Sequence, residues 1–317
     1  MQKWLVTGAT GLLGANSMRL LGGDAVASAR ELPPQFDHPA RGIRCDLTDS
    51  QARKGLVTRS GATTVLHAAA LASIEACESD PELARELNVQ AAADLAAEAR
   101  DAGMGFVHIS TDAVFDGRDG GYSEKSATNP QTVYARTKLE SEEAVLTAHP
   151  GAVVARVNFY GWSATGRRGL AEYFYHHLAA GEAAPGFDDQ RVSTLQVKYL
   201  IESLVAIEQR WSGGIVHVAS SESLTKYEFG VRLATALGLD PTLVKKTHQA
   251  EILEIVRGSQ LDLDTSLAES ILGHPMPDQN SGFEELRREL DGGVARFLRE
   301  YATEKSRSAT DREARVL

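Results

Sequence analysis

The sequence predicts an α/β protein built on a doubly wound parallel sheet. Short apolar strand patterns alternate with helical patterns through the first half, a glycine-rich turn joins the first strand to the first helix, and polar residues follow several strands. This alternation is typical of a parallel sheet that helices cover on both faces. Ligands of such sheets bind beyond the carboxyl ends of the strands.

The elements of the first half follow in a regular order. Strands are predicted at 3–7, 25–29, 42–45, 63–67, 105–109 and 152–157, and helices at 12–21, 81–100 and 132–148. The start of the second helix is well marked, because a capping residue, a proline and an acid stand together at 79–82.

The second half carries a looser pattern. Helices are predicted at 170–180, 196–209 and 225–237, and a strand at 214–219. The last stretch, 303–317, is polar and charged with few apolar residues, so we expect a flexible tail there.

Composition excludes several classes of protein. The net charge of −10 argues against nucleic acid as a partner, because phosphate backbones select basic surfaces. No apolar run is long enough to span a bilayer, and no secretory signal precedes the first strand. The two cysteines, Cys45 and Cys77, make no disulfide framework and are expected to be buried. We expect a cytoplasmic protein without a membrane partner.

The turn after the first strand has the composition of a dinucleotide-binding loop. Gly8 permits the tight turn, Gly11 lets the backbone approach a pyrophosphate, and Gly14 lets the helix pack close to the strand. The helix N-terminus would then face the phosphates with unpaired N–H groups. The other residues expected along this ligand in the loop are Thr10, Leu12 and Leu13.

The choice of dinucleotide depends on the end of the second strand. An acid about twenty residues past the first glycine would bind ribose hydroxyls and favour NAD(H). That region holds Ser28 and Arg30, which suit a 2′-phosphate. We therefore expect NADP(H), with NAD(H) as the alternative because Glu31 is adjacent.

Tyr134 and Lys138 are the candidate proton-transfer pair. Residues i and i+4 lie on one face of a helix. A neighbouring ammonium and a nicotinamide cation would lower the pKa of the phenol towards neutral pH. Thr111, just past a buried strand, is placed to hydrogen-bond the same substrate oxygen. The spacing Tyr301–Lys305 is the same, but it falls in the expected tail.

The motifs together resemble the extended short-chain dehydrogenase/reductases, and more narrowly the dTDP-4-dehydrorhamnose reductases and related sugar-nucleotide-binding proteins. The segments that carry the resemblance are 8–14, 67–70, 88, 110–117, 134–138 and 156–161, with looser likeness at 187–190 and 257–262.

The resemblance implies a Rossmann domain with a smaller C-terminal α/β substrate lobe. The Rossmann domain would span 1–165, with 190–220 returning to it, and the lobe would comprise 166–189 and 221–300. It also implies reduction by NADPH of a nucleotide-linked 4-keto-6-deoxy sugar, with Thr111, Tyr134 and Lys138 as the catalytic residues.

Further site residues are carried over from the same resemblance. Along the cofactor they are Asp46, Leu47, Ala68, Ala69, Ala70 and Asn88. Towards the substrate they are Asn158, Phe187 and Arg257, and Arg191 is expected beside them because its charge could clamp a substrate diphosphate. A small-molecule substrate and a homodimer are compatible with this pattern, and no metal site is expected.

Departures from the family pattern leave alternatives open. Ala113 stands where the reductases usually carry tyrosine, Gly258 replaces a proline, and 190–194 lacks the usual glycine–proline pattern. A sugar dehydratase is disfavoured, because it uses an Asp–Glu pair where this chain has Asp112–Ala113. A nucleotide-sugar epimerase and a non-catalytic NADP-binding regulatory subunit remain the alternatives.

Overall fold

The computed structural model describes residues 2–36, 38, 41–167, 169–253 and 258–300. The expected tail at 303–317 and the candidate substrate residue Arg257 lie outside the described residues.

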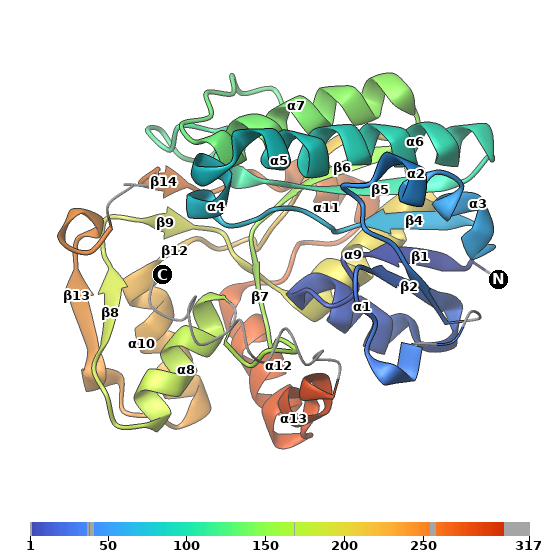
Figure 1. The fold of residues 1–317 in the computed structure, drawn as a ribbon. Coiled ribbons are helices and arrows are strands. Elements are labelled where there is room, and N and C mark those ends of the chain that lie inside the picture. The colour runs from blue at the N-terminus through green and yellow to red at the C-terminus, as the bar shows by residue number, and fades with distance from the viewer. Residues whose placement is uncertain (1, 37, 39–40, 168, 254–257, 301–317) are drawn as a thin grey trace.

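A seven-stranded sheet forms the centre of the molecule (Figure 1). All its pairs are parallel, in the order β11–β6–β5–β4–β1–β2–β3. The strands are β1 (Trp4–Thr7), β2 (Ala25–Ala29), β3 (Gly42–Arg44), β4 (Thr64–His67), β5 (Gly105–Thr111), β6 (Val153–Val157) and β11 (Gly214–Val218). The predicted α/β class with a doubly wound parallel sheet is confirmed.

Helices cover both faces of this sheet. The helices α1 (Leu12–Leu21), α9 (Val197–Arg210) and α11 (Ser266–Leu272) lie on one face, and α3 (Leu56–Ser60), α6 (Ala91–Asp101) and α7 (Val133–Ala148) on the other (Figure 1). Side chains of a strand alternate between faces, so Trp4 and Val6 enter one core and Leu5 the other.

The predicted helix at 81–100 is interrupted. It divides into α5 (Pro81–Arg85), a π-helical turn (Glu86–Gln90) and α6. Such turns interrupt α-helices mostly as single insertions and are frequent at functional sites. The sequence did not predict the short helices α2 (Ser50–Arg53), α3 and α4 (Ile74–Ser79), nor α11 and the two helices that follow it.

A second lobe packs beside the carboxyl edge of the sheet. Its helices are α8 (Leu170–Ala179), α10 (Lys226–Leu237), α12 (Gln279–Asp291) and α13 (Val294–Arg299). Its short strands are β7 (Phe159–Tyr160), β8 (Ala184–Phe187), β9 (Arg191–Val192), β10 (Leu195–Gln196), β12 (Leu224–Thr225), β13 (Val244–Thr247) and β14 (Gln260–Leu261). The aromatic rings of Tyr160, Phe229 and Phe283 pack edge-on or tilted, in the same apolar core that Trp4 and Val6 of the sheet enter.

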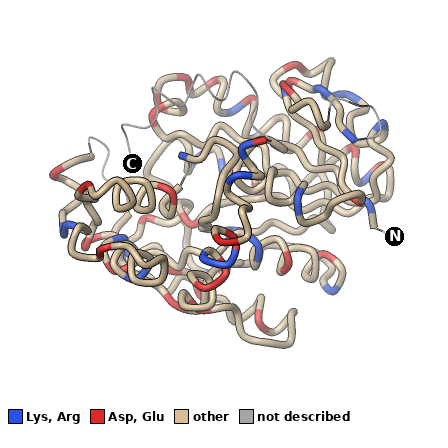
Figure 2. The backbone as a smooth tube through the Cα atoms, turned by 90° about the horizontal axis from the view of Figure 1, so that it is seen from below, with Lys and Arg blue, Asp and Glu red and all other residues tan. Residues whose placement is uncertain are grey.

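Short 3₁₀ turns complete the described elements, at Gly22–Asp24, Pro34–Phe36, Asp112–Val114, Pro241–Leu243 and Gln249–Glu251. Among the described residues, no helix combines the length and apolarity that crossing a membrane requires. Figure 2 shows acidic and basic positions interspersed along the chain. Cys45 and Cys77 are both buried free thiols, as expected.

Candidate active site

The glycine loop between β1 and α1 has no room for side chains. Gly8 has a φ of +65°, and a Cβ there would lie 2.8 Å from the Cα of Ala69. A Cβ on Gly14 would overlap the carbonyl oxygen of Gly8. Gly11 is the N-cap of α1 and supplies no side-chain hydrogen bond. This backbone cradle at a helix N-terminus fits the pyrophosphate of a dinucleotide.

The ends of β2 and β3 lie next to the glycine loop. Ser28 is buried, and its Oγ has no partner among the described residues. Arg30 is exposed after β2. Burial opposes ionisation of Asp46, but hydrogen bonds from Thr48 and the charge of Arg30 outweigh it and lower the pKa of Asp46. An orphaned hydroxyl and a guanidinium at this place fit a 2′-phosphate.

The loop after β4 is fastened by Asn88. Asn88 Oδ1 accepts from the Leu71 amide at 2.7 Å, and Nδ2 donates to Thr137 Oγ1 at 3.0 Å. The Ala69 amide donates to Thr7 Oγ1 at 3.3 Å. Asn88 therefore ties this loop to α7, and its π-helical turn places it there.

A cavity of about 1030 Å³ opens between the sheet edge and the second lobe. Three of the predicted residues line it, Thr111, Tyr134 and Asn158. Gly169 also lines it, and a Cβ there would lie 3.4 Å from Leu12. Gly169 therefore brings this wall of the cavity close to the start of α1, whereas the described lining includes no residue of the glycine loop itself.

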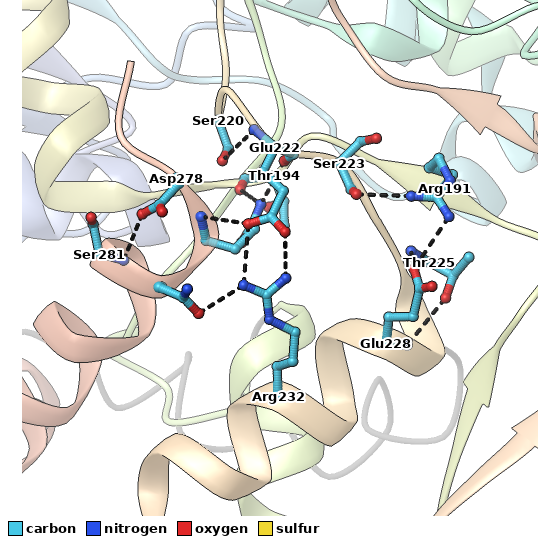
Figure 3. Close-up of polar contacts among 12 residues, drawn as sticks. Arg191, Thr194, Ser220, Glu222, Ser223, Thr225, Glu228, Arg232, Asp278 and Ser281 are labelled. Atoms are coloured by element: carbon cyan, nitrogen blue, oxygen red, sulfur yellow. Dashed lines mark hydrogen bonds and ion pairs between the residues drawn. The ribbon is translucent and has the colours of Figure 1, made fainter. Parts of the chain in front are cut away.

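Two of the predicted substrate residues lie outside the lining. Among the described residues the wall includes Gln190 and Val192 but neither Phe187 nor Arg191. The Arg191 guanidinium donates to the Ser223 carbonyl at 2.8 Å and pairs with Glu228 at 3.3 Å (Figure 3). It is held by its own lobe because β9 pairs with β12.

Tyr134 sits in a half-buried position at the start of α7. Burial, together with Asp112 and Cys77, raises the pKa of its phenol to about 12, and the contribution of Thr111 partly opposes this rise. The expected lowering of this pKa is therefore wrong for the protein's own groups. At neutral pH the phenol therefore keeps its proton.

Lys138 lies one turn further along α7 and is not among the described residues that line the cavity. Its side chain is 2% exposed, and Nζ lies 3.2 Å from Nε2 of His108. Burial lowers the pKa of Lys138 to about 8, and the charge of Glu142 opposes this. His108 is buried, and burial with the charge of Lys138 holds its pKa well below 6.5. A neutral imidazole is thus the neighbour of this ammonium.

Asp112 is the residue that sequence reasoning did not assign. It lines the cavity, is 4% exposed, and accepts hydrogen bonds from Thr111 and Asn158. Burial raises its pKa to about 6. Its position next to Thr111 in the sequence could have indicated a site residue, but the Asp112–Ala113 pair served there only to disfavour a sugar dehydratase. Lys226 also lines the cavity from α10, and no spacing in the sequence pointed to it.

One group of acids and a histidine lies away from the cavity wall. Single ligand atoms of Asp188, Asp189 and His248 lie within 4.8 Å of one another. The Lys246 ammonium is bonded to Asp188 at 2.9 Å. That positive charge disfavours a cation at the same carboxylate.

Comparison with known proteins places the chain in a family. The model of the RmlD substrate binding domain matches residues 2–291. The chain belongs to this family. The sequence-based resemblance to the dTDP-4-dehydrorhamnose reductases and other extended short-chain dehydrogenase/reductases is thereby confirmed.

Two relatives of this chain have names that state different roles, one a reductase and the other an enzyme subunit. A Haloferax volcanii protein named as a probable low-salt glycan biosynthesis reductase is 34% identical over 86% of this chain and 93% of its own. The methionine adenosyltransferase 2 subunit beta of Xenopus tropicalis is 32% identical over 84% of this chain and 81% of its own.

A solved structure shares the fold of this RmlD-family chain. The dTDP-4-dehydrorhamnose reductase of Bacillus anthracis in complex with NADP aligns with a TM-score of 0.81 at 22% identity. The alignment covers 91% of this chain and all of that one.

Proposed function

We propose that the chain is an NADPH-dependent reductase of a nucleotide-linked 4-keto-6-deoxy sugar. The observation that carries this proposal is the cavity, whose wall brings Thr111, Tyr134 and Asn158 together, and it is joined by the backbone cradle of the glycine loop, which fits a dinucleotide. Membership of the RmlD family and similarity to a probable reductase support it. Ser28 and Arg30 favour the 2′-phosphorylated cofactor.

The chain's own residues would divide the work as follows. The bound nicotinamide supplies the hydride. Tyr134 gives its proton to the ketone oxygen, because its phenol stays protonated at neutral pH. Lys138, whose Nζ lies against His108 one helical turn from Tyr134, would supply positive charge on the same face of α7. Asn158 lies at the same wall, after β6.

NADPH oxidation with dTDP-4-keto-6-deoxyglucose tests this proposal. We expect turnover by the wild type and a fall in kcat of about 10² to 10⁴ in Tyr134→Phe. Tyr199→Phe, on α9 and outside the described cavity lining, is the matched control. Full turnover by Tyr134→Phe would exclude Tyr134 as the donor.

The cofactor is tested separately by binding. Arg30→Ala should weaken NADPH far more than NADH, because only NADPH carries the 2′-phosphate. Equal weakening of both would sink the assignment of Arg30.

A second candidate function is a non-catalytic regulatory subunit that binds NADP. The similarity to the methionine adenosyltransferase subunit favours it. Tight NADPH binding without turnover across a panel of nucleotide-linked keto sugars would select this alternative.

A further inference from the structure

The Lys138 ammonium meets a buried histidine of the neighbouring strand. Its Nζ, on α7, lies 3.2 Å from Nε2 of His108 on β5, and α7 packs on that strand (Figure 1). Both residues are buried, Lys138 with 2% and His108 with 0% exposure. In the part of the chain that the structure describes, this contact is the only side-chain hydrogen bond of the ammonium. Glu142, on the next turn of α7, is paired with Arg156 at 2.7 Å.

The two groups differ in charge at pH 7. Burial lowers the pKa of Lys138 to about 8, so the ammonium is still its main form. Burial and the charge of Lys138 hold the pKa of His108 well below 6.5, so its ring is neutral. A neutral imidazole has one N–H and one nitrogen with a free lone pair, whereas an ammonium can only donate. The contact is therefore a hydrogen bond only if Nε2 is the nitrogen without the proton.

The neighbours of the His108 ring bear on where its proton lies. Ser141 Oγ lies 2.9 Å from Nε2, and it donates its one proton to the Lys138 carbonyl at 2.7 Å. With the ring proton on Nε2, His108 would donate to Ser141 and turn an N–H towards the ammonium. With the ring proton on Nδ1, the Nε2 lone pair is free to accept from the ammonium. Nδ1 has no partner among the described residues in either case, so the charge of Lys138 decides the tautomer.

A second histidine fixes the plane of the His108 ring. The rings of His67 and His108 stack with centroids 5.4 Å apart and planes 18° apart, because the two residues are in register on β4 and β5. Nδ1 of His67 in turn lies 2.8 Å from Thr7 Oγ1 at the end of β1. A ring that is held on its face and bonded at its edge presents Nε2 in one direction, towards α7.

We propose that His108 is the positioning residue of Lys138, and that it fixes the ammonium by accepting a hydrogen bond through an unprotonated Nε2. The strand that carries His108 ends at Thr111, and the helix that carries Lys138 begins beside Tyr134. The hydrogen bond therefore fastens together the two elements on which the proposed catalytic residues stand. Its effect on turnover rests on the proposed reductase function, whereas the hydrogen bond itself does not.

Nitrogen NMR of the cofactor-free protein, labelled with ¹⁵N in its histidines, tests the hydrogen bond without turnover. Protonated and unprotonated ring nitrogens differ in chemical shift, and the signals of His108 are those lost in His108→Gln. At pH 7 we expect a protonated Nδ1 and an unprotonated Nε2. In Lys138→Met the ring is free to donate to Ser141, so we expect its proton on Nε2. A wild-type ring protonated at Nε2, or the same tautomer in Lys138→Met, would overturn the proposal.

Ser141→Ala is the matched control for the NMR comparison. It removes the other neighbour of Nε2 and leaves the ammonium in place, so His108 should keep its proton on Nδ1. Movement of the proton to Nε2 in this variant would show that Ser141 sets the tautomer and would count against Lys138. These spectra also decide the hydrogen bond if a His108 variant made for turnover fails to fold.

Turnover tests the positioning role itself. Glutamine can place an amide oxygen near the site of Nε2, whereas leucine cannot accept a hydrogen bond. With NADPH and dTDP-4-keto-6-deoxyglucose, His108→Leu should lower kcat about 10²-fold with little change in KM, because the ammonium is displaced. His108→Gln should recover most of that loss. Equal losses of kcat in the two variants would overturn the positioning role, whereas an inactive wild type would refute the reductase function.

Discussion

Replacing Lys138 by methionine should stabilise the protein while it removes activity. The Lys138 ammonium is buried, and its Nζ lies 3.2 Å from Nε2 of His108, whose ring is neutral. Burial lowers its pKa from 10.5 to about 8. Neither neighbour loses its last partner in the variant: His108 Nε2 still lies 2.9 Å from Ser141 Oγ, and Glu142 stays paired with Arg156.

The size of the effect follows from that difference in pKa. Holding the charged form in the folded chain costs about 3 kcal/mol at pH 7. Methionine removes this cost, but the variant also loses the hydrogen bond to His108, which lowers its stability by about 1 kcal/mol. We therefore expect Lys138→Met to raise the free energy of unfolding by about 2 kcal/mol at pH 7. The gain fades as pH rises from 8 to 10.5, because the folded and then the unfolded lysine lose their protons.

Urea unfolding followed by circular dichroism at pH 7 and at pH 10.5 measures this gain. Lys198→Met is the control, because a hydrogen bond and the charge of Glu285 outweigh burial there and raise the pKa of Lys198. That variant should lose stability at pH 7. A Lys138→Met protein that unfolds at lower urea than the wild type at pH 7 would refute the reasoning.

Three other outcomes are expected. Gly14→Ala should weaken NADPH binding at least tenfold by calorimetry, because its methyl group would overlap a loop carbonyl, whereas Gly23→Ala, which meets open space, should bind normally; equal binding would exclude the backbone cradle. Arg156→Met should lower the free energy of unfolding by about 3–5 kcal/mol in a denaturant titration, because it leaves Glu142 buried and unpaired; an unchanged midpoint would contradict this. Burial lowers the pKa of His67 to about 3, so its ring resists protonation only in the folded state and the protein loses stability as pH falls from 6.5 towards 3. His67→Asn should lessen this loss of unfolding free energy by about 1.4 kcal/mol per pH unit in denaturant titrations over that pH range. If the free energy of unfolding fell equally with pH in both proteins, His67 would not contribute to the loss.

The first half of the fold could be predicted because its signals are local. Strands such as β4 and β5 are largely buried and carry adjacent apolar residues, Val65–Leu66 and Phe106–Val107, and the glycine loop marks the turn before α1. The strands of the second lobe carry no such signal, since β7 and β9 have two residues each and a period cannot be read from two positions.

The site was predictable in part for the same reason. Thr111, Tyr134 and Asn158 follow strands or start a helix, and they meet at the cavity. Lys226 reaches the same wall from α10, which only the tertiary fold brings there. Arg191 was predicted from its charge alone. In the structure its guanidinium forms an ion pair with Glu228, so it does not line the described cavity.

The position of β11 at the edge of the sheet has a consequence for synthesis of the chain. The polypeptide leaves the sheet after β6 and returns only with α9 and β11. Until then the outer edge of β6 offers unpaired backbone groups, and the face that α9 will cover is bare. If translation pauses before α9 and β11 are made, the nascent sheet therefore exposes an unpaired strand edge and an uncovered apolar face, both of which favour aggregation. We expect release from the ribosome to depend on how fast that last strand docks, and chaperone demand to be greatest just before it.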